Sequence, residues 1–343
     1  MSEKGQNIIL KLGSRTIECG LEGSHQPLVV YNVHHFAENQ NMQVSSISNK
    51  DELTTFKTLF YPNILVYENE EIFKNNLQNH LRKLLTKIFY KSGISTINAK
   101  LLLISNNTLS EYYIDLISLV LLNHFMMRAV VVLPTPLMVS IASGSSSAIV
   151  VDFGWEYINI DVIFDNRILQ NYSKFTTKSG RYLHYNLLEQ LKVLDFDTNL
   201  ISFKDIEIVV SSMKDIINLE GVVCCGPNKI KKSLISNIIT SLLLESDENF
   251  DDDNEKCPVQ LIVELIEREL PLDLRTIVSD RLILTGGLFE IEGVEQIMIE
   301  NLNSNSRFNF NTIHSLGSFA GASLYSTLSK QLRKNQNLKE YRK

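Results

Sequence analysis

Two glycine turns are the places in this sequence whose residue types suggest chemistry. In the stretch AIVVDFGWEYINIDVIFDNRIL an apolar strand runs to Asp152, Gly154 follows, and a second apolar strand returns. Gly13 and Ser14 separate an earlier pair of apolar strands in the same way. Glycine lets the backbone approach a ligand closely, and successive N–H groups of a turn can hold an anion. Both turns are therefore candidate phosphate-binding hairpins, and they look like two copies of one device.

The tip of the second turn argues against a ligand there. Trp155 and Glu156 follow Gly154 and place a bulky ring and a negative charge at the tip. One hypothesis is that Trp155 fills the space that a phosphate would occupy. The other is that Trp155 is a ring at the edge of the core, and the sequence favours neither.

The apolar pattern predicts the elements that must position these turns. Apolar residues recur at three and four in the predicted helices, and short apolar runs bounded by turn residues mark the predicted strands. Gly286 and Gly287 follow one such strand and predict a sharp turn. Strands and helices alternate through much of the chain, which indicates an α/β fold with two sheets. Outside the second hairpin, the predicted strands are residues 8–12, 16–21, 100–105, 129–133 and 281–285, and the predicted helices are residues 72–91, 110–127, 134–144, 180–193, 259–270, 293–301 and 317–332.

Length and charge bound the class of protein. The chain has 343 residues, of which 44% are hydrophobic, which is enough for two domains or one large bilobal one. The net charge of −6 does not favour a broad nucleic-acid-binding surface. Residues 245–256 hold seven acids and one base, whereas residues 330–343 hold six bases and one acid. We predict that the acidic loop (245–256) and the basic tail (333–343) are solvated.

Cysteine usage and hydropathy predict a protein without disulfides or a membrane span. The four cysteines have no C-x-x-C spacing, and we predict reduced thiols in a cytosolic or nuclear protein. The start, MSEKGQ, lacks the charged-then-apolar pattern of a signal peptide. The most apolar stretch, residues 116–133, is interrupted by polar residues, which favours a helix, a turn and a strand. The seven histidines do not cluster at metal-ligand spacing, so no metal site is predicted.

Four segments, taken in order, resemble the actin-related protein family. LKLGSRTIECGLEG is similar to the family's first phosphate hairpin and VVDFGWEYINIDVIFDNRIL to its second. LILTGGLFEIEGVEQIM is similar to the adenosine-side motif, and HSLGSFAGASLYSTL to the closing helix. LKEYRK resembles the start of the family's final tail, cut short. Together the segments span nearly the whole chain.

The resemblance implies an actin-like bilobal α/β fold, shared with Hsp70 and sugar kinases, with two related β-sheet domains and a degenerate nucleotide cleft. Residues 1–145 would form the first lobe, with a small subdomain shortened to about residues 32–50. The closing helix, about residues 317–332, would return to that lobe. Residues 146–316 would form the second lobe.

The resemblance also assigns a nucleotide site. In the family the two hairpins face each other across a cleft, and an Asp in each holds the hydrated divalent metal. The cofactor-binding positions that this chain retains are Gly13, Ser14, Asp152, Gly154, Gly286 and Gly287.

The chain departs from the family at the charged and catalytic positions. The first metal-facing Asp falls at Lys11 and the phosphate-contacting Lys falls at Glu18, so both charges are inverted. The catalytic Gln position falls at Thr135 and the His position at Asn159. Each charge-assisted contact is worth about 1.5–3 kcal/mol, so the two inversions should cost several orders of magnitude in affinity. We therefore expect no catalytic residue, no bound metal, no cofactor and no enzymatic activity.

Two segments resemble the pointed-end actin-related proteins of dynactin. They are ELPLDLRTIVSDRLILTGG and TKSGRYLHYNLLEQL. The resemblance implies a non-catalytic subunit that caps the pointed end of the short actin-related filament. Its partners would be the filament protein and other pointed-end subunits and, indirectly, dynein and microtubules. The implied location is cytoplasmic and cytoskeletal, and the implied processes are dynein-driven transport, nuclear migration and spindle positioning.

Two other functions remain open. Nuclear actin-related subunits of chromatin-remodelling complexes also lose hydrolysis, although they usually carry larger insertions than residues 245–256. An active ATPase or sugar kinase shares the fold but needs acids in both hairpins. Of these acids, Asp152 is the one that this chain clearly retains.

Overall fold

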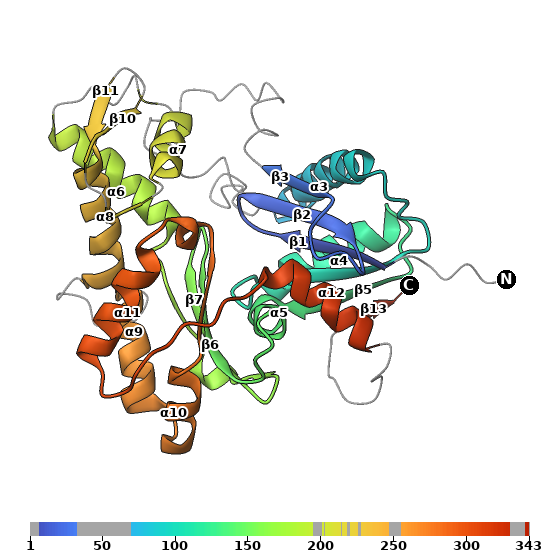
Figure 1. Cartoon of the computed structure of the whole chain (residues 1–343). Coiled ribbons are helices and arrows are strands. Elements are labelled where there is room, and N and C mark those ends of the chain that lie inside the picture. Colours follow the sequence, from blue (N-terminus) through green and yellow to red (C-terminus); the bar gives the residue numbers. More distant parts are fainter. Residues whose placement is uncertain are drawn as a thin grey trace. The chain divides into compact units, whose positions relative to one another are not determined.

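The computed structural model describes residues 7–32, 70–194, 201, 203–213, 215–217, 220–225, 228–246, 255–329 and 340–342. These residues form a mixed α/β structure in two compact units (Figure 1). The boundary in the chain falls between Gly144 and Ser145, and the segment from Leu316 onward returns to the first unit. Most of the predicted small subdomain, the centre of the acidic loop and most of the basic tail lie outside the described residues.

The first unit is built on one six-stranded sheet with the order β13-β5-β4-β1-β2-β3. Strand β1 pairs antiparallel with β2, which pairs antiparallel with β3. On its other side β1 pairs parallel with β4, and β4 pairs parallel with β5. The strands are β1 (Asn7–Leu12), β2 (Thr16–Leu21), β3 (Val29–Asn32), β4 (Lys100–Ser105), β5 (Ala129–Pro134) and β13 (Glu340–Arg342).

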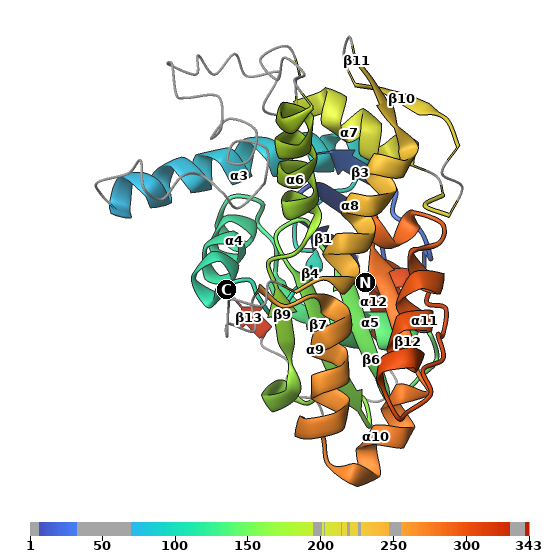
Figure 2. The same cartoon turned by 90° about the vertical axis from the view of Figure 1, so that its left-hand side faces the viewer.

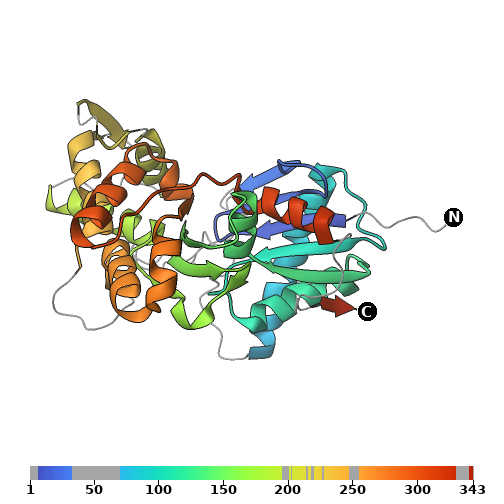
Figure 3. The same cartoon turned by 60° about the horizontal axis from the view of Figure 1, so that its bottom comes forward.

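Helices cover both faces of this sheet, and its central strands are therefore apolar on both sides. Helices α3 (Glu70–Ser92) and α4 (Glu111–Asn123) pack on one face, with Leu81 and Leu84 in the same buried cluster as Ile8 of β1. Helices α5 (Thr135–Ala142) and α12 (Gly317–Ser329) pack together against the sheet, as Figure 3 shows for the red helix α12.

The second unit repeats the same strand pattern around its hairpin. Strand β6 lies between the parallel strand β12 and the antiparallel strand β7, and β7 pairs onward with β8 and β9. The strands are β6 (Ala148–Phe153), β7 (Ile158–Phe164), β8 (Arg167–Ile168), β9 (Lys174–Thr176) and β12 (Leu282–Gly286), with a separate two-stranded sheet of β10 (Val222–Cys225) and β11 (Asn228–Lys231).

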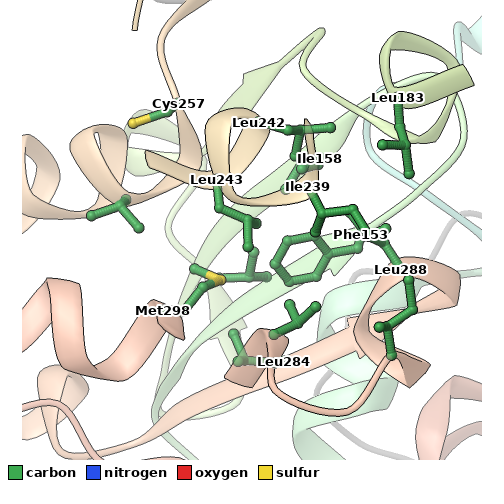
Figure 4. Close-up of a cluster of buried hydrophobic side chains, with 14 of the residues drawn as sticks. Phe153, Ile158, Leu183, Ile239, Leu242, Leu243, Cys257, Leu284, Leu288 and Met298 are labelled. Carbon is green, nitrogen blue, oxygen red and sulfur yellow. The ribbon is translucent and has the colours of Figure 1, made fainter. Parts of the chain in front are cut away.

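Helices gather beside this sheet around one hydrophobic core (Figure 2). Figure 4 shows Phe153 of β6 among side chains from helices and from the neighbouring strands, including Leu183, Ile239, Leu284 and Met298. The helices are α6 (Gly180–Val193), α7 (Phe203–Ser212), α8 (Lys232–Leu244), α9 (Pro258–Glu264), α10 (Leu272–Ser279) and α11 (Val294–Asn305), with short turns at η2 (Gln170–Tyr172), η5 (Leu265–Glu269) and η6 (Gly287–Glu290).

Most predicted elements are present, with some corrections. The helix predicted at 110–127 ends at Asn123, because the chain turns there and Phe125 packs against Phe89. The helix predicted at 259–270 is α9 followed by a π-helical turn. Glu340–Arg342 of the basic tail form strand β13 at the sheet edge, an element that was not predicted. Elements β3, α7, β10, β11 and α8 were not predicted.

Other observations concern the whole described part of the chain. All four cysteines are free thiols, as predicted. Among the residues that the structure describes, no helix is long and apolar enough to cross a membrane. The apolar stretch 116–133 forms a helix, a turn and a strand, as predicted.

Candidate functional site

The first candidate hairpin joins β1 to β2 through Gly13. Its N–H donates to the carbonyl of Thr16 at 2.9 Å. A Cβ at Gly13 would lie 2.8 Å from the same carbonyl oxygen, closer than real Cβ contacts allow. Glycine is therefore required by this close approach, and Ser14 follows it in the turn.

The second hairpin repeats this geometry between β6 and β7. The N–H of Gly154 donates to the carbonyl of Tyr157 at 3.1 Å, again three residues further on. A Cβ at Gly154 would lie 2.7 Å from that oxygen. The prediction that the two turns are copies of one device is confirmed at the level of backbone geometry.

The two charged side chains of the first hairpin form an ion pair with each other. Lys11 of β1 and Glu18 of β2 are direct cross-strand partners. The Lys11 Nζ lies 3.1 Å from the Glu18 Oε1, and the side chains are 32% and 21% exposed. Directly opposed side chains on paired strands interact most strongly when their charges are opposite. Each charge is thus neutralised within the hairpin.

The tip of the second hairpin is hydrogen-bonded to the start of α6. The carbonyl of Gly154 accepts from the N–H of Gly180 at 3.2 Å, and the carbonyl of Trp155 accepts from the N–H of Arg181 at 2.9 Å. The first N–H groups of a helix have no partner in the helix itself and are a common anion site. Here two of these N–H groups donate hydrogen bonds to carbonyl oxygens of the hairpin.

Side chains strengthen this attachment. The Ser179 hydroxyl, which is fully buried, lies 2.7 Å from the carbonyl oxygen of Trp155 and 3.0 Å from that of Glu156. The Glu156 carboxylate pairs with Arg181 at 3.2 Å. A negative charge at a helix N-terminus also interacts favourably with the helix dipole. The carboxylate at the tip thus has both a cation and a helix end as neighbours.

The Trp155 ring lies against α6 within its own unit. It contacts the His184 ring edge-on, with 4.6 Å between ring centroids. A Cβ at Gly180 would lie 3.2 Å from the Trp155 Cε3, so a side chain there would press on the ring. The ring is partly buried, and these contacts place it beside Gly180 and His184 of α6.

Asp152 lies beside small polar residues in the sheet. It is directly opposite Asn159 of β7 and, on its other side, Thr285 of β12. Directly opposed residues point to the same face, so a carboxylate, an amide and a hydroxyl share this face. Thr135, at the predicted catalytic Gln position, is a buried first residue of α5 in the other unit.

The paired glycines behave differently from each other. Gly286 has a φ of +103°, and a Cβ there would lie 2.4 Å from the carbonyl oxygen of Phe153. Gly287 has no such atom within 4 Å. Because Gly286 has no Cβ, the end of β12 can lie against the backbone of Phe153 at the end of β6. Gly287 has no steric need to be glycine.

The predicted site residues fall into two groups. Asp152 on β6, Gly154 directly after β6, Gly286 at the end of β12 and Gly287 directly after β12 belong to the second unit. Gly13 and Ser14 belong to the first unit. Ser179 and Arg181 were not predicted to take part in this arrangement, although a Ser directly before a helix is a signal for a helix cap. Ser179 in fact makes no such cap, since its hydroxyl bonds to the hairpin.

The chemistry of the described residues gives no group that could hold a metal. No cluster of three or more His, Cys, Asp or Glu side chains with suitable placement occurs in the described part of the chain. No protein-family model and no curated protein matches the chain.

Proposed function

We propose that the chain has an actin-like fold and serves as a non-catalytic scaffold subunit. The shared strand pattern of the two units supports the fold: a hairpin with a parallel strand on one side and further antiparallel strands on the other. The matching glycine turns at Gly13 and Gly154 support it further. Two related units, each with one such hairpin, are what the resemblance to actin-related proteins implies.

The observation that carries the loss of catalysis is the Lys11–Glu18 ion pair. In the family these two positions attract a metal and a phosphate, whereas here they hold opposite charges that attract each other. A nucleotide would have to break this pair and then meet a cation at the metal position and an anion at the phosphate position. The second hairpin adds a second obstacle, because its tip is bonded to α6 through Gly180 and Arg181.

The proposed role is to cap the pointed end of the short actin-related filament of dynactin. Support comes from the two segments that resemble the pointed-end actin-related proteins, ELPLDLRTIVSDRLILTGG and TKSGRYLHYNLLEQL. The partners would be the filament protein and other pointed-end subunits, and the complex would serve dynein-driven transport in the cytoplasm. The alternative is a nuclear subunit of a chromatin remodeller.

Purification of the protein with its native partners tests this role. We would place the affinity tag at the N-terminus, because Glu340–Arg342 near the C-terminus pair with β5. Dynactin filament and pointed-end subunits are expected to co-purify in fixed ratio. Co-purification of a remodeller ATPase instead would move the protein to the nuclear alternative, and isolation as a monomer would contradict both.

A further inference from the structure

Helix α3 presents a solvent face that is basic and aromatic. Between Glu71 and Glu111 the sequence has six Lys or Arg residues and no Asp or Glu, although acids outnumber bases by 39 to 33 in the whole chain. Three of these bases, Lys83, Lys87 and Lys91, are exposed at a spacing of four residues. Residues four apart on a helix are neighbours about 6 Å apart along its axis. The lysines therefore form one row.

The opposite side of α3 fixes this row in place. Leu77, Leu81, Leu84, Leu85 and Ile88 of α3 are buried in the core of the first unit. A helix with a buried apolar stripe keeps its polar face toward solvent. The row of lysines is thus a fixed feature of the surface.

An exposed aromatic residue lies within the row. Tyr90 is 87% exposed, the highest value among the large hydrophobic residues that the structure describes. It is seven residues from Lys83 and three from Lys87, so it lies on the same face. Nearby, Lys91 is held over the Tyr31 ring, with its Nζ 4.9 Å from the ring centroid.

The loops after α3 and α4 add two more exposed apolar side chains at the same end of the unit. Ile97 is 72% and Met126 is 59% exposed. The N–H of Asn98 donates to the carbonyl of Met126 at 3.0 Å, so the two loops are joined. Asn98 and Met126 both have positive φ angles, of 57° and 51°. Such angles are uncommon for residues other than glycine and are often found at functional positions.

We propose that this face of α3, defined by Lys83, Lys87, Tyr90 and Lys91, docks an acidic polypeptide segment of a partner protein that carries apolar side chains beside its carboxylates. Charge complementarity supplies the lysine contacts, and Tyr90 supplies a large apolar contact of the kind that anchors interfaces. A nucleic acid duplex or an anionic membrane fits less well. Both have a far higher charge density than a peptide and would be repelled more strongly by a chain of net charge −6.

This inference does not depend on the proposed function, since it uses the surface charge and exposure of one helix. The two proposals fail separately: loss of dynactin partners leaves peptide docking intact, and absence of peptide docking leaves the fold and the hairpins unchanged.

The test measures binding of a fluorescent synthetic peptide rich in Glu and Leu to the full-length protein. The expected result is saturable binding that weakens as salt rises and vanishes when every Glu of the peptide is replaced by Gln. Reversal of three charges, in K83E/K87E/K91E, should weaken binding about tenfold or more. Tyr90→Ser should weaken it about fivefold, with little change in salt dependence.

A matched control keeps the test specific. The triple variant R167E/K229E/K231E changes the net charge equally at exposed positions of the second unit, and it should bind the peptide within about twofold of the native protein. Each variant is first checked for a native circular dichroism melt. The proposal would be overturned if both triple variants lost binding equally or if the native protein did not bind the peptide. It would also be overturned if a DNA duplex or phosphatidylserine-containing vesicles bound more tightly than the peptide through these lysines.

Discussion

The two hairpins have the same backbone turn but neutralise their polar groups in different ways. In the first, Lys11 and Glu18 face each other across the strands, so the charges are paired within the hairpin. In the second, the tip bonds to a helix through Gly180 and Arg181, so the pairing is tertiary. The comparison shows that the same glycine turn occurs with two different sets of partners for the polar groups around it. The partner is a side chain of the neighbouring strand in the first hairpin and the start of α6 in the second.

The largest of the predicted losses in the free energy of unfolding concerns Gly286, which lies beside Phe153 at the end of β6. Gly286→Ala places a Cβ 2.4 Å from the carbonyl of Phe153 at a φ of +103°. We expect at least about 3 kcal/mol loss in the free energy of unfolding, from the backbone clash and the strained φ together. Gly287→Ala is the matched control, with open space around it, and should change stability by less than about 0.5 kcal/mol. Urea unfolding of both variants measures this, and equal effects would show that Gly286 is not tightly packed.

The next largest losses of stability are expected at the turn glycines of the two hairpins, Gly13 and Gly154. A Cβ at Gly13 or Gly154 meets a carbonyl oxygen at 2.8 or 2.7 Å, so each Gly→Ala variant should lose about 1–3 kcal/mol. The loss should be larger at Gly154, since moving that tip also disturbs its bonds to α6. A larger loss at Gly13 in the same unfolding assay would contradict the tertiary attachment of the second tip.

A smaller loss of stability is expected when the hydrogen bonds from Ser179 to the tip of the second hairpin are removed. Ser179→Ala removes a buried hydroxyl that contacts two carbonyl oxygens of the tip, and we expect a loss of about 1–2 kcal/mol. Ser211→Ala, at an exposed hydroxyl of α7, is the control and should be neutral within about 0.5 kcal/mol. If the two serines behave alike in thermal melts, the tip does not depend on Ser179.

The smallest effect concerns the first hairpin. A double-mutant cycle with Lys11→Met and Glu18→Gln should give a coupling energy of about 0.5 kcal/mol, because both side chains are partly exposed. The charge-swapped variant K11E/E18K should keep most of that coupling. A coupling of zero at low salt would mean that the two charges do not neutralise each other in solution.

The hairpins could be predicted from the sequence because apolar runs around a glycine are a local signal. The helix α8 could also have been predicted, since Ile235, Ile238, Ile239, Leu242 and Leu243 recur at three and four and are buried. Strand β13 has no apolar run, and only its pairing with β5 makes it a strand.

The surroundings of the candidate site were harder to predict. Opposed charges such as Lys11 and Glu18 can be paired once the turn between their strands is known. The hydrogen bonds between the tip of the second hairpin and the start of α6 join residues more than twenty positions apart in the sequence, and no local sequence pattern predicts them. Sequence therefore located the turns, while tertiary structure revealed what occupies the polar groups of the second one.

We propose that the two hairpins do not hold a nucleotide. The most direct measurement is extraction of nucleotide from freshly purified full-length protein, followed by calorimetric titration with ATP and Mg²⁺. We predict no stoichiometric ATP or ADP and no saturable binding tighter than about 1 mM. One nucleotide bound per chain would contradict this proposal, because the Lys11–Glu18 ion pair would then have to coexist with a bound phosphate and its metal.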